Sequence, residues 1–176
     1  MTVQTQDTGK AVSAVIAQSW HRCSKFMQRE TWQTPHQAQG LTFDSICRRK
    51  TALLTIGQAA LEDAWEFMDG RPCALFILDE TACILSRCGE PQTLAQLADL
   101  GFRDGSYCAE SIIGTCALSL AAMQGQPINT AGDRHFKQAL QPWSFCSTPV
   151  FDNHGRCSAL SRFAVWWSTS PAPTFP

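Results

Sequence analysis

The chain has 176 residues, enough for one domain with a hydrophobic core, and its 44% hydrophobic and 16% charged residues exclude intrinsic disorder. The formal net charge is −1, so no broad electrostatic surface for nucleic acid is expected. No apolar run is long enough for a membrane span, and no signal peptide is recognisable. The nine cysteines are therefore expected to be reduced thiols of a cytoplasmic protein without disulfides.

Two helices are expected before the first strand. Apolar residues at helical spacing predict one over residues 11–29, and the proline and glycine of residues 31–42 predict a loop. The clearest pattern predicts a single long helix over residues 44–68, ended by Gly70. Helices in this position suit either a dimer interface or docking within the chain, and the pattern leaves both open.

The middle of the chain predicts a strand hairpin and further helices. Residues 73–78 form a continuous apolar run, and a tight turn leads to a second strand at residues 83–87. The first strand shows no alternation, so both of its faces are expected to be buried in the middle of a sheet. Helices are expected over residues 91–100 and 111–124, with a loop over 101–110 between them.

The last part of the chain predicts more strands. A short extended piece at residues 126–130 and a helical turn at 133–140 precede a strand at 144–151. A turn follows at 152–155, and the chain from Cys157 onward is expected to return as the partner strand. The order of elements predicts an α+β fold, with helices packed on a central, mainly antiparallel sheet.

The segment over residues 157–176 is unusual. Trp166 and Trp167 are adjacent, and prolines exclude a helix over the last nine residues. We interpret this segment as an aberrant tail produced by a reading-frame shift near codon 157, and a genuine short tail is the alternative.

Four motifs in a fixed order resemble a known family. They are Ser19-Trp20-x-Arg22-Cys23, Leu75-Phe76-Ile77-Leu78-Asp79, Glu110-x-x-x-Gly114-Thr115, and His135-Phe136 with Trp143-x-x-Cys146-x-x-Pro149. Over residues 11–156 the chain resembles the N-terminal GAF-type sensory domain of sigma-54-class activators of acetoin and glycerol metabolism. The resemblance is greatest to the activators of dihydroxyacetone kinase operons. It stops beyond Arg156, and no phosphate-binding loop of the family's motor domain is present.

The resemblance implies a GAF-like fold and a regulatory role without catalysis. The organisation expected from it is a leader, helix and loop at residues 1–42, a helix plus an incomplete sensory domain at 43–156, and the tail at 157–176. The family's motor and DNA-binding domains are absent from this sequence, so no direct contact with nucleic acid is expected.

Partners follow from the resemblance as well. It implies that dihydroxyacetone kinase subunits contact the sensory region, with a small molecule as the alternative signal. Trp32, with Met27 nearby, is the candidate for an exposed anchor at a partner surface. A homodimer through the N-terminal helices is a further expectation.

A ligand pocket is expected where the 101–110 loop meets the next helix. Convergent polar groups amid apolar walls are typical of small-molecule sites. The competing interpretation is that Arg103 and Asp104 solvate a turn and that Glu110 favours a helix start. Related domains often have other residues at Tyr107 and Cys116, so the ligand does not carry over. The candidate pocket residues are Arg103, Asp104, Tyr107, Cys108, Glu110 and Thr115.

Two other functions remain open at this stage. One is a cysteine-based redox enzyme on a GAF fold, similar to methionine sulfoxide reductase. The other is an iron-dependent nitric oxide sensor with Asp104, Cys108 and Glu110 as ligands. We expect no cofactor and no metal. The cysteines considered for the enzyme are Cys73, Cys83, Cys88, Cys108 and Cys116.

Overall fold

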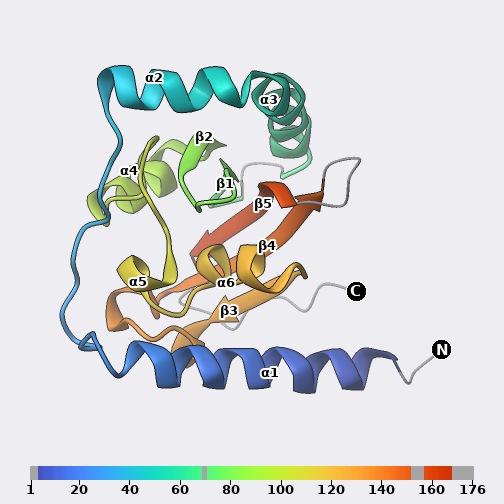
Figure 1. The fold of residues 1–176 in the computed structure, drawn as a ribbon. Coiled ribbons are helices and arrows are strands. Elements are labelled where there is room, and N and C mark those ends of the chain that lie inside the picture. The colour runs from blue at the N-terminus through green and yellow to red at the C-terminus, as the bar shows by residue number, and fades with distance from the viewer. Residues whose placement is uncertain (1–3, 69–70, 152–156, 168–176) are drawn as a thin grey trace.

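The fold is organised around a five-stranded antiparallel sheet (Figure 1). The computed structural model describes residues 4–68, 71–151 and 157–167. The strand order is β2-β1-β5-β4-β3. The strands are β1 (Cys73–Leu78), β2 (Ile84–Gly89), β3 (Ile128–Ala131), β4 (Trp143–Phe151) and β5 (Cys157–Trp167). The expected α+β class with a mainly antiparallel sheet is confirmed.

Helices cover both faces of this sheet. In Figure 1, α2 and α3 lie above the sheet and α1 lies below it. Within the described residues no helix is both long and apolar enough to cross a membrane. The helices are α1 (Gln4–Cys23), α2 (Gly40–Arg49), α3 (Thr51–Glu66), α4 (Pro91–Asp99), α5 (Glu110–Ile113) and α6 (Ala117–Gln124), with 3-10 turns at Gly132–Arg134 and Gln138–Leu140.

Strand β1 separates two hydrophobic clusters. Leu75 and Ile77 belong to the cluster under α2 and α3, whereas Phe76 and Leu78 belong to the larger cluster that α1, α4, α5 and α6 cover. All six residues of β1 are buried. The prediction of a central strand with two buried faces is therefore confirmed, and the absence of alternation has this physical cause.

The prediction of a single helix over residues 44–68 is wrong, because the chain turns at Lys50. Residue 50 leaves helical geometry (φ −110°, ψ 19°), and its N–H bonds the carbonyls of Ile46 and Cys47. The Thr51 hydroxyl donates to the carbonyl of Arg48 at 2.8 Å. These bonds satisfy the last carbonyls of α2, and the turn lets the Lys50 side chain pair with Glu80.

The helix expected over residues 111–124 is also divided. Gly114 adopts φ +73° and ends α5, and α6 starts after Cys116. A Cβ at position 114 would lie 3.3 Å from the sulfur of Met27, so a larger residue would meet both backbone strain and a close contact. The predicted end of α6 at Gly125 is confirmed, with φ +61°.

The strand expected from Cys157 is present as β5 and occupies the middle of the sheet. It pairs with β1 on one side and with β4 on the other. The first eleven residues of the segment interpreted as a tail are therefore strand. The reading-frame interpretation stays a prediction, and the turn at 152–155 and residues 168–176 lie outside the described residues.

The first helix differs from the expected range. Expected over residues 11–29, it is present as α1, Gln4–Cys23. The chain leaves the helix after Cys23 through a short turn, in which the N–H groups of Phe26 and Met27 both bond the carbonyl of Cys23. Residues 24–29 therefore belong to the connection that leads to α2.

Candidate functional site

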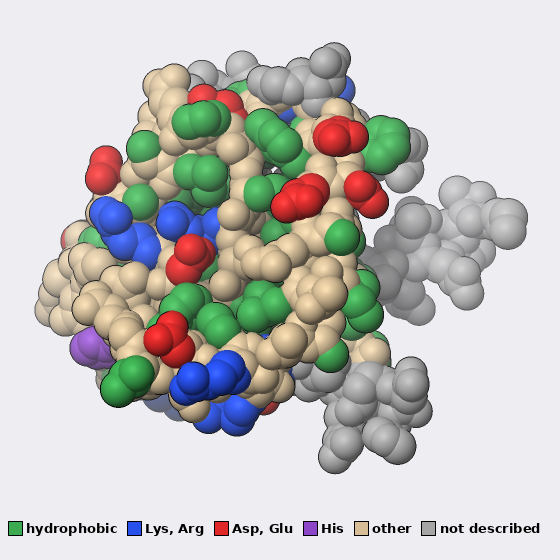
Figure 2. Space-filling model, turned by 90° about the horizontal axis from the view of Figure 1, so that it is seen from above, with side chains coloured by type: hydrophobic (Ala, Val, Ile, Leu, Met, Phe, Trp, Pro, Cys, Tyr) green, Lys and Arg blue, Asp and Glu red, His purple; other side chains and the backbone are tan. Residues whose placement is uncertain are grey.

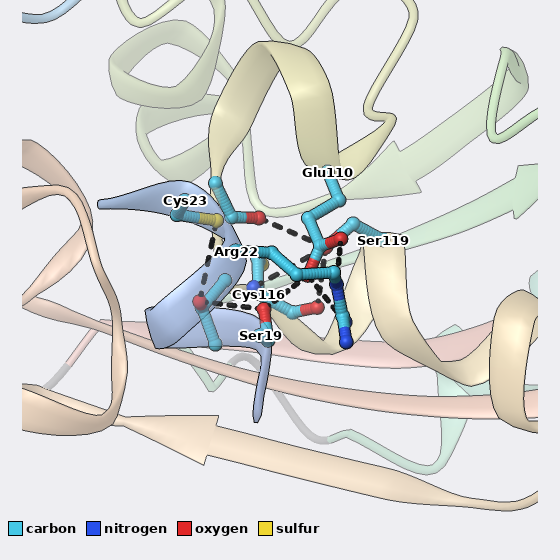
Figure 3. A network of polar contacts seen from close by, with 8 residues as sticks. Ser19, Arg22, Cys23, Glu110, Cys116 and Ser119 are labelled. Carbon is cyan, nitrogen blue, oxygen red and sulfur yellow. Dashed lines mark hydrogen bonds and ion pairs between the residues drawn. The ribbon is translucent and has the colours of Figure 1, made fainter. Parts of the chain in front are cut away.

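A polar network joins the end of α1 to α5 and to the turn that follows it (Figure 3). The Glu110 carboxylate accepts hydrogen bonds from Nε of Arg22 at 3.0 Å and from Nη2 at 2.8 Å. The Ser19 hydroxyl donates to the same carboxylate. This bidentate, charge-assisted arrangement fixes the direction of both helices. We call Ser19, Arg22, Cys23, Glu110 and Thr115 the α1–α5 junction.

The inner part of the junction is buried. The hydroxyl oxygens of Ser19 and Thr115 lie 2.7 Å apart, and the sulfur of Cys23 lies 3.7 Å from the Thr115 hydroxyl. Ser19, Cys23 and Thr115 have no exposed surface, whereas the Arg22 side chain is 38% exposed and that of Glu110 10%. Burial raises the pKa of the Cys23 thiol, so its neutral form is favoured. The arrangement suits mechanical coupling better than nucleophilic chemistry.

The local sequence explains this geometry. Ser19, Arg22 and Cys23 have the spacing i, i+3 and i+4, which places them on one face of α1. Glu110 is the first residue of α5, and Gly114 ends that helix just before Thr115. Sequence reasoning quoted these residues as family motifs but did not assign a role to Ser19 or Arg22. The signal that could have found them is the i, i+3 and i+4 spacing of Ser19, Arg22 and Cys23 within a predicted helix.

The six candidate pocket residues do not gather in one place. Glu110 and Thr115 meet in the α1–α5 junction. Arg103 is exposed, and Asp104 pairs with Arg87 at 2.9 Å. Arg87 also donates to the carbonyl of Phe102 at 2.9 Å, so its side chain braces the loop.

Tyr107 and Cys108 point to different surroundings. Tyr107 lines a surface hollow of 470 Å³ together with α2 and the β1–β2 turn, and burial raises its pKa. Cys108 is fully buried in the larger hydrophobic cluster, and burial raises the pKa of its thiol well above the usual value. One side chain is therefore accessible to a ligand and the other is part of the core.

Both partner-surface candidates are half-buried. Trp32 was expected to be exposed, but it is half-buried, its indole N–H donates to the carbonyl of Leu100 at 3.1 Å, and its ring lies 6.1 Å from that of Phe102. Met27 is half-buried and lines a hollow beside the exposed Phe26. Trp32 is not exposed as expected because the connection between α1 and α2 packs along the core.

The described residues give little support to cysteine or metal chemistry. Burial raises the pKa of Cys83 to about 12 and raises the pKa values of Cys73 and Cys88. A reactive thiol needs the opposite shift. No group of three His, Cys, Asp or Glu side chains within the described residues is placed to hold a metal ion. The three residues considered as iron ligands do not lie together: Asp104 pairs with Arg87, Cys108 lies in the core, and Glu110 pairs with Arg22.

A buried histidine lies near the junction. His135 has no exposed surface, and its Nε2 lies 3.1 Å from the carbonyl of Trp143. Its Nδ1 has no hydrogen-bond partner among the described residues. Burial lowers the pKa of His135 to about 4, so the ring is neutral at pH 7.

Comparisons with known proteins find a GAF family model and two operon regulatory proteins that are similar to this chain. A family model described as GAF domain matches residues 52–162, beyond the expected end of the resemblance at residue 156. The glycerol metabolism operon regulatory protein of Citrobacter freundii is 86% identical over 156 residues, which are 89% of this chain and 24% of that protein. The PTS-dependent dihydroxyacetone kinase operon regulatory protein of Escherichia coli (strain K12) is 69% identical over 168 residues, 96% of this chain and 26% of that protein.

A solved structure shares both sequence and fold with the chain. It is the crystal structure of the E. coli DhaR(N)-DhaL complex, with a TM-score of 0.86 and 64% sequence identity. The match covers 90% of this chain and 54% of that chain. The chain thus spans about a quarter of the length of the curated relatives it matches.

Proposed function

The chain belongs to the GAF domain family, and we propose from this that it is the sensory domain of a cytoplasmic transcription activator of a dihydroxyacetone and glycerol operon. In this role it binds a kinase subunit or a small ligand and performs no catalysis. The proposal assigns it no direct contact with DNA. The similarity to operon regulators over nearly the whole chain supports it.

One observation carries the partner part of the proposal. The chain in the DhaR(N)-DhaL complex is 64% identical to this one, and its fold superposes with a TM-score of 0.86. We infer that this chain binds the corresponding subunit of its own dihydroxyacetone kinase. Binding energy at such surfaces concentrates in a few large side chains, so a small number of variants can test it.

The connection between α1 and α2 is the proposed contact surface. Phe26 is 57% exposed and Met27 lies beside it, half-buried. Trp32 lies in the same connection, and its ring lies 6.1 Å from that of Phe102. A small ligand, the alternative signal, has Tyr107 as the candidate residue that lines a surface hollow, with Arg103 and Asp104 at the same loop.

Isothermal titration of the chain with the kinase subunit tests the proposal. We expect binding by the parent chain and a loss of about tenfold in affinity, or about 1.4 kcal/mol, for Met27→Lys. Met123→Lys is the matched control, because Met123 is 56% exposed on α6. No binding by a cooperatively folded parent chain contradicts the proposed function. Equal binding by both variants contradicts only the proposed surface.

We further propose a homodimer through the N-terminal helices. Leu41 of α2, Ile56 of α3 and Phe67 just after α3 are 82%, 74% and 88% exposed. Figure 2 shows apolar side chains interspersed with both acidic and basic ones on this face. Sedimentation velocity tests the idea with Ile56→Glu, which should give monomers, against Thr55→Glu, which should not. An unchanged sedimentation coefficient for Ile56→Glu contradicts this dimer surface.

A further inference from the structure

A hollow of 470 Å³ lies between the connection that follows α1 and the segment around Lys137. Residues 24–28, Thr31, Gln33 and Lys137 line it. Two of these side chains are lysines, Lys25 and Lys137, and none of the lining residues is acidic. We call this feature the Lys137 hollow.

Lys137 is unusual among the residues that line the hollow, because it is a lysine and is only 4% exposed. Its ammonium group donates to the carbonyls of Gln28 at 2.6 Å and Thr31 at 2.8 Å. An ammonium has three donors, so these two bonds leave one. Carbonyl dipoles also compensate a buried charge less completely than a carboxylate does.

The charge of Lys137 has no ion-pair partner among the described residues. The ion pairs found there join Arg22 with Glu110, Lys50 with Glu80, and Arg87 with Asp104. Burial lowers the pKa of Lys137, and the charge of Glu30 on the neighbouring loop opposes this shift without forming a pair. Lys25 and Lys137 are the two charged side chains that line the hollow, and two cations around one concave surface favour an anion.

The hollow is also connected to the α1–α5 junction. A Cβ at Gly114 would lie 3.3 Å from the sulfur of Met27 and 3.5 Å from Cγ of Lys137. The N–H of Gln138 donates to the carbonyl of Arg29 at 3.0 Å. A ligand in the hollow would therefore bridge two segments that already hold the end of α1 in place.

We propose that the Lys137 hollow binds a small phosphate monoester, with the phosphate group between the ammonium groups of Lys25 and Lys137. A phosphate offers several acceptor oxygens and close to two negative charges at neutral pH, which matches two ammonium groups better than a monovalent carboxylate does. This site lies apart from Tyr107 and goes beyond the proposed binding of a kinase subunit. An anion bound there stabilises the connection between α1 and α2.

Thermal melts with inorganic phosphate as the probe test this proposal. Sodium phosphate replaces sodium chloride at constant ionic strength, and sodium acetate provides the carboxylate comparison. We expect the midpoint to rise with phosphate concentration as RT ln(1 + [L]/Kd) and to rise less with acetate. Equal rises with phosphate and acetate overturn the proposal, because they indicate a general effect of salt.

Variants then locate the effect. Lys137→Met should abolish the phosphate response, and Lys25→Gln should weaken affinity about tenfold, as the loss of one charge-assisted hydrogen bond implies. Lys50→Gln, a lysine paired with Glu80 on the other side of the sheet, is the matched control and should respond like the parent. A parental response in both Lys25→Gln and Lys137→Met overturns the proposal.

A second measurement covers the case in which Lys137→Met fails to fold. Phosphate is titrated into the 15N-labelled parent and Lys25→Gln chains, and backbone amide shifts are followed by NMR. Saturable shifts in residues 24–33 and at Lys137, weakened in the variant, support the site, and their absence overturns it. Binding of the kinase subunit is measured separately, so failure of the anion site is distinguishable from failure of the proposed function.

Discussion

Replacing Glu110 by glutamine tests whether the α1–α5 junction holds α1 against the domain. The substitution keeps the shape of the side chain but removes the charge that accepts two hydrogen bonds from Arg22 and one from Ser19. A hydrogen bond to a charged group contributes about 1.5–3 kcal/mol. The value is discounted because the Arg22 side chain is 38% exposed and glutamine retains one acceptor. We expect a loss of about 2 kcal/mol in the free energy of unfolding.

The loss converts to a measurable shift. For a chain of this size about 1 kcal/mol lowers the melting midpoint by about 2–4 °C, so Glu110→Gln should lower it by about 4–8 °C. Glu80→Gln is the control, because Glu80 is 47% exposed and pairs with Lys50 at the surface. Its cost should stay within about 0.5 kcal/mol. The free energies of unfolding of both variants are measured by urea unfolding, and their melting midpoints by thermal unfolding, each followed by circular dichroism.

Hydrogen exchange shows where the stability is lost. In Glu110→Gln the amides of α1 should exchange faster than in the parent, while those of β1 keep their relative protection. A double-mutant cycle with Arg22→Met should give a coupling energy of about 1 kcal/mol between the two positions. If Glu110→Gln costs no more than Glu80→Gln, the junction does not hold α1 and the reasoning is refuted.

Three further predictions concern pH, thiol reactivity and backbone strain. Because burial lowers the pKa of His135 from 6.5 to about 4, the unfolded chain binds the proton more tightly, and about 3 kcal/mol of stability should be lost as pH falls from 6.5 to 4. His135→Gln should flatten that part of the stability–pH curve, and an unchanged curve would argue against the assignment. Ellman's reagent counts the thiols of the native chain that react fast, and Cys146→Ser should remove one of them because Cys146 is exposed. Cys108→Ser should remove none, because Cys108 is buried and its pKa is raised. Loss of a fast-reacting thiol in Cys108→Ser would mean that this core thiol is accessible. Gly105→Ala should destabilise the fold by about 2 kcal/mol or more, because φ is +86° and a Cβ would lie 2.2 Å from the carbonyl oxygen of Ala38. Gly132→Ala should cost only about 1 kcal/mol, because φ is also positive but nothing lies within 4 Å of the added Cβ. Equal losses in the free energy of unfolding, measured with urea, would rule out the close contact as the cause.

Much of the sheet could be predicted from local patterns. The unbroken apolar run of β1 indicated burial on both faces, and Leu75 and Phe76 do belong to different hydrophobic clusters. Gly125 marked the end of α6, because a glycine has no Cβ and so adopts the left-handed conformation that ends many helices. These features depend on residues adjacent in sequence, so the sequence contains the information directly.

The helix breaks could not be predicted in the same way. The helical pattern continues across Lys50 and across Gly114, and a single glycine disfavours a helix by only about 1 kcal/mol, so the pattern alone does not locate either break. What decides the breaks is tertiary: the Lys50 side chain reaches Glu80, and Met27 packs against Gly114. Such contacts join residues 30 or more positions apart, which a periodicity argument does not consider.

The candidate pocket shows the same limit. Asp104 and Cys108 are neighbours in sequence, and proximity alone grouped them. In the fold Asp104 turns towards Arg87 and Cys108 enters the core. Ser19 and Glu110, by contrast, are 91 positions apart and bond directly. Only the placement of α1 against α5 brings them together.

The central position of β5 bears on how the chain reaches its native state. Among the described residues, the β1–β2 hairpin and the β3–β4 pair are hydrogen-bonded to each other through β5, which lies between them in the sheet. Pairings between distant segments are slow to form, because loop-closure entropy is lost before the contacts reward it. During synthesis both pairs leave the ribosome before residues 157–167, and until then each has an open edge on the side that β5 later occupies. The nascent chain therefore depends on its last described strand to close the sheet, and a pause before that strand would lengthen the time in which those edges can pair with other chains.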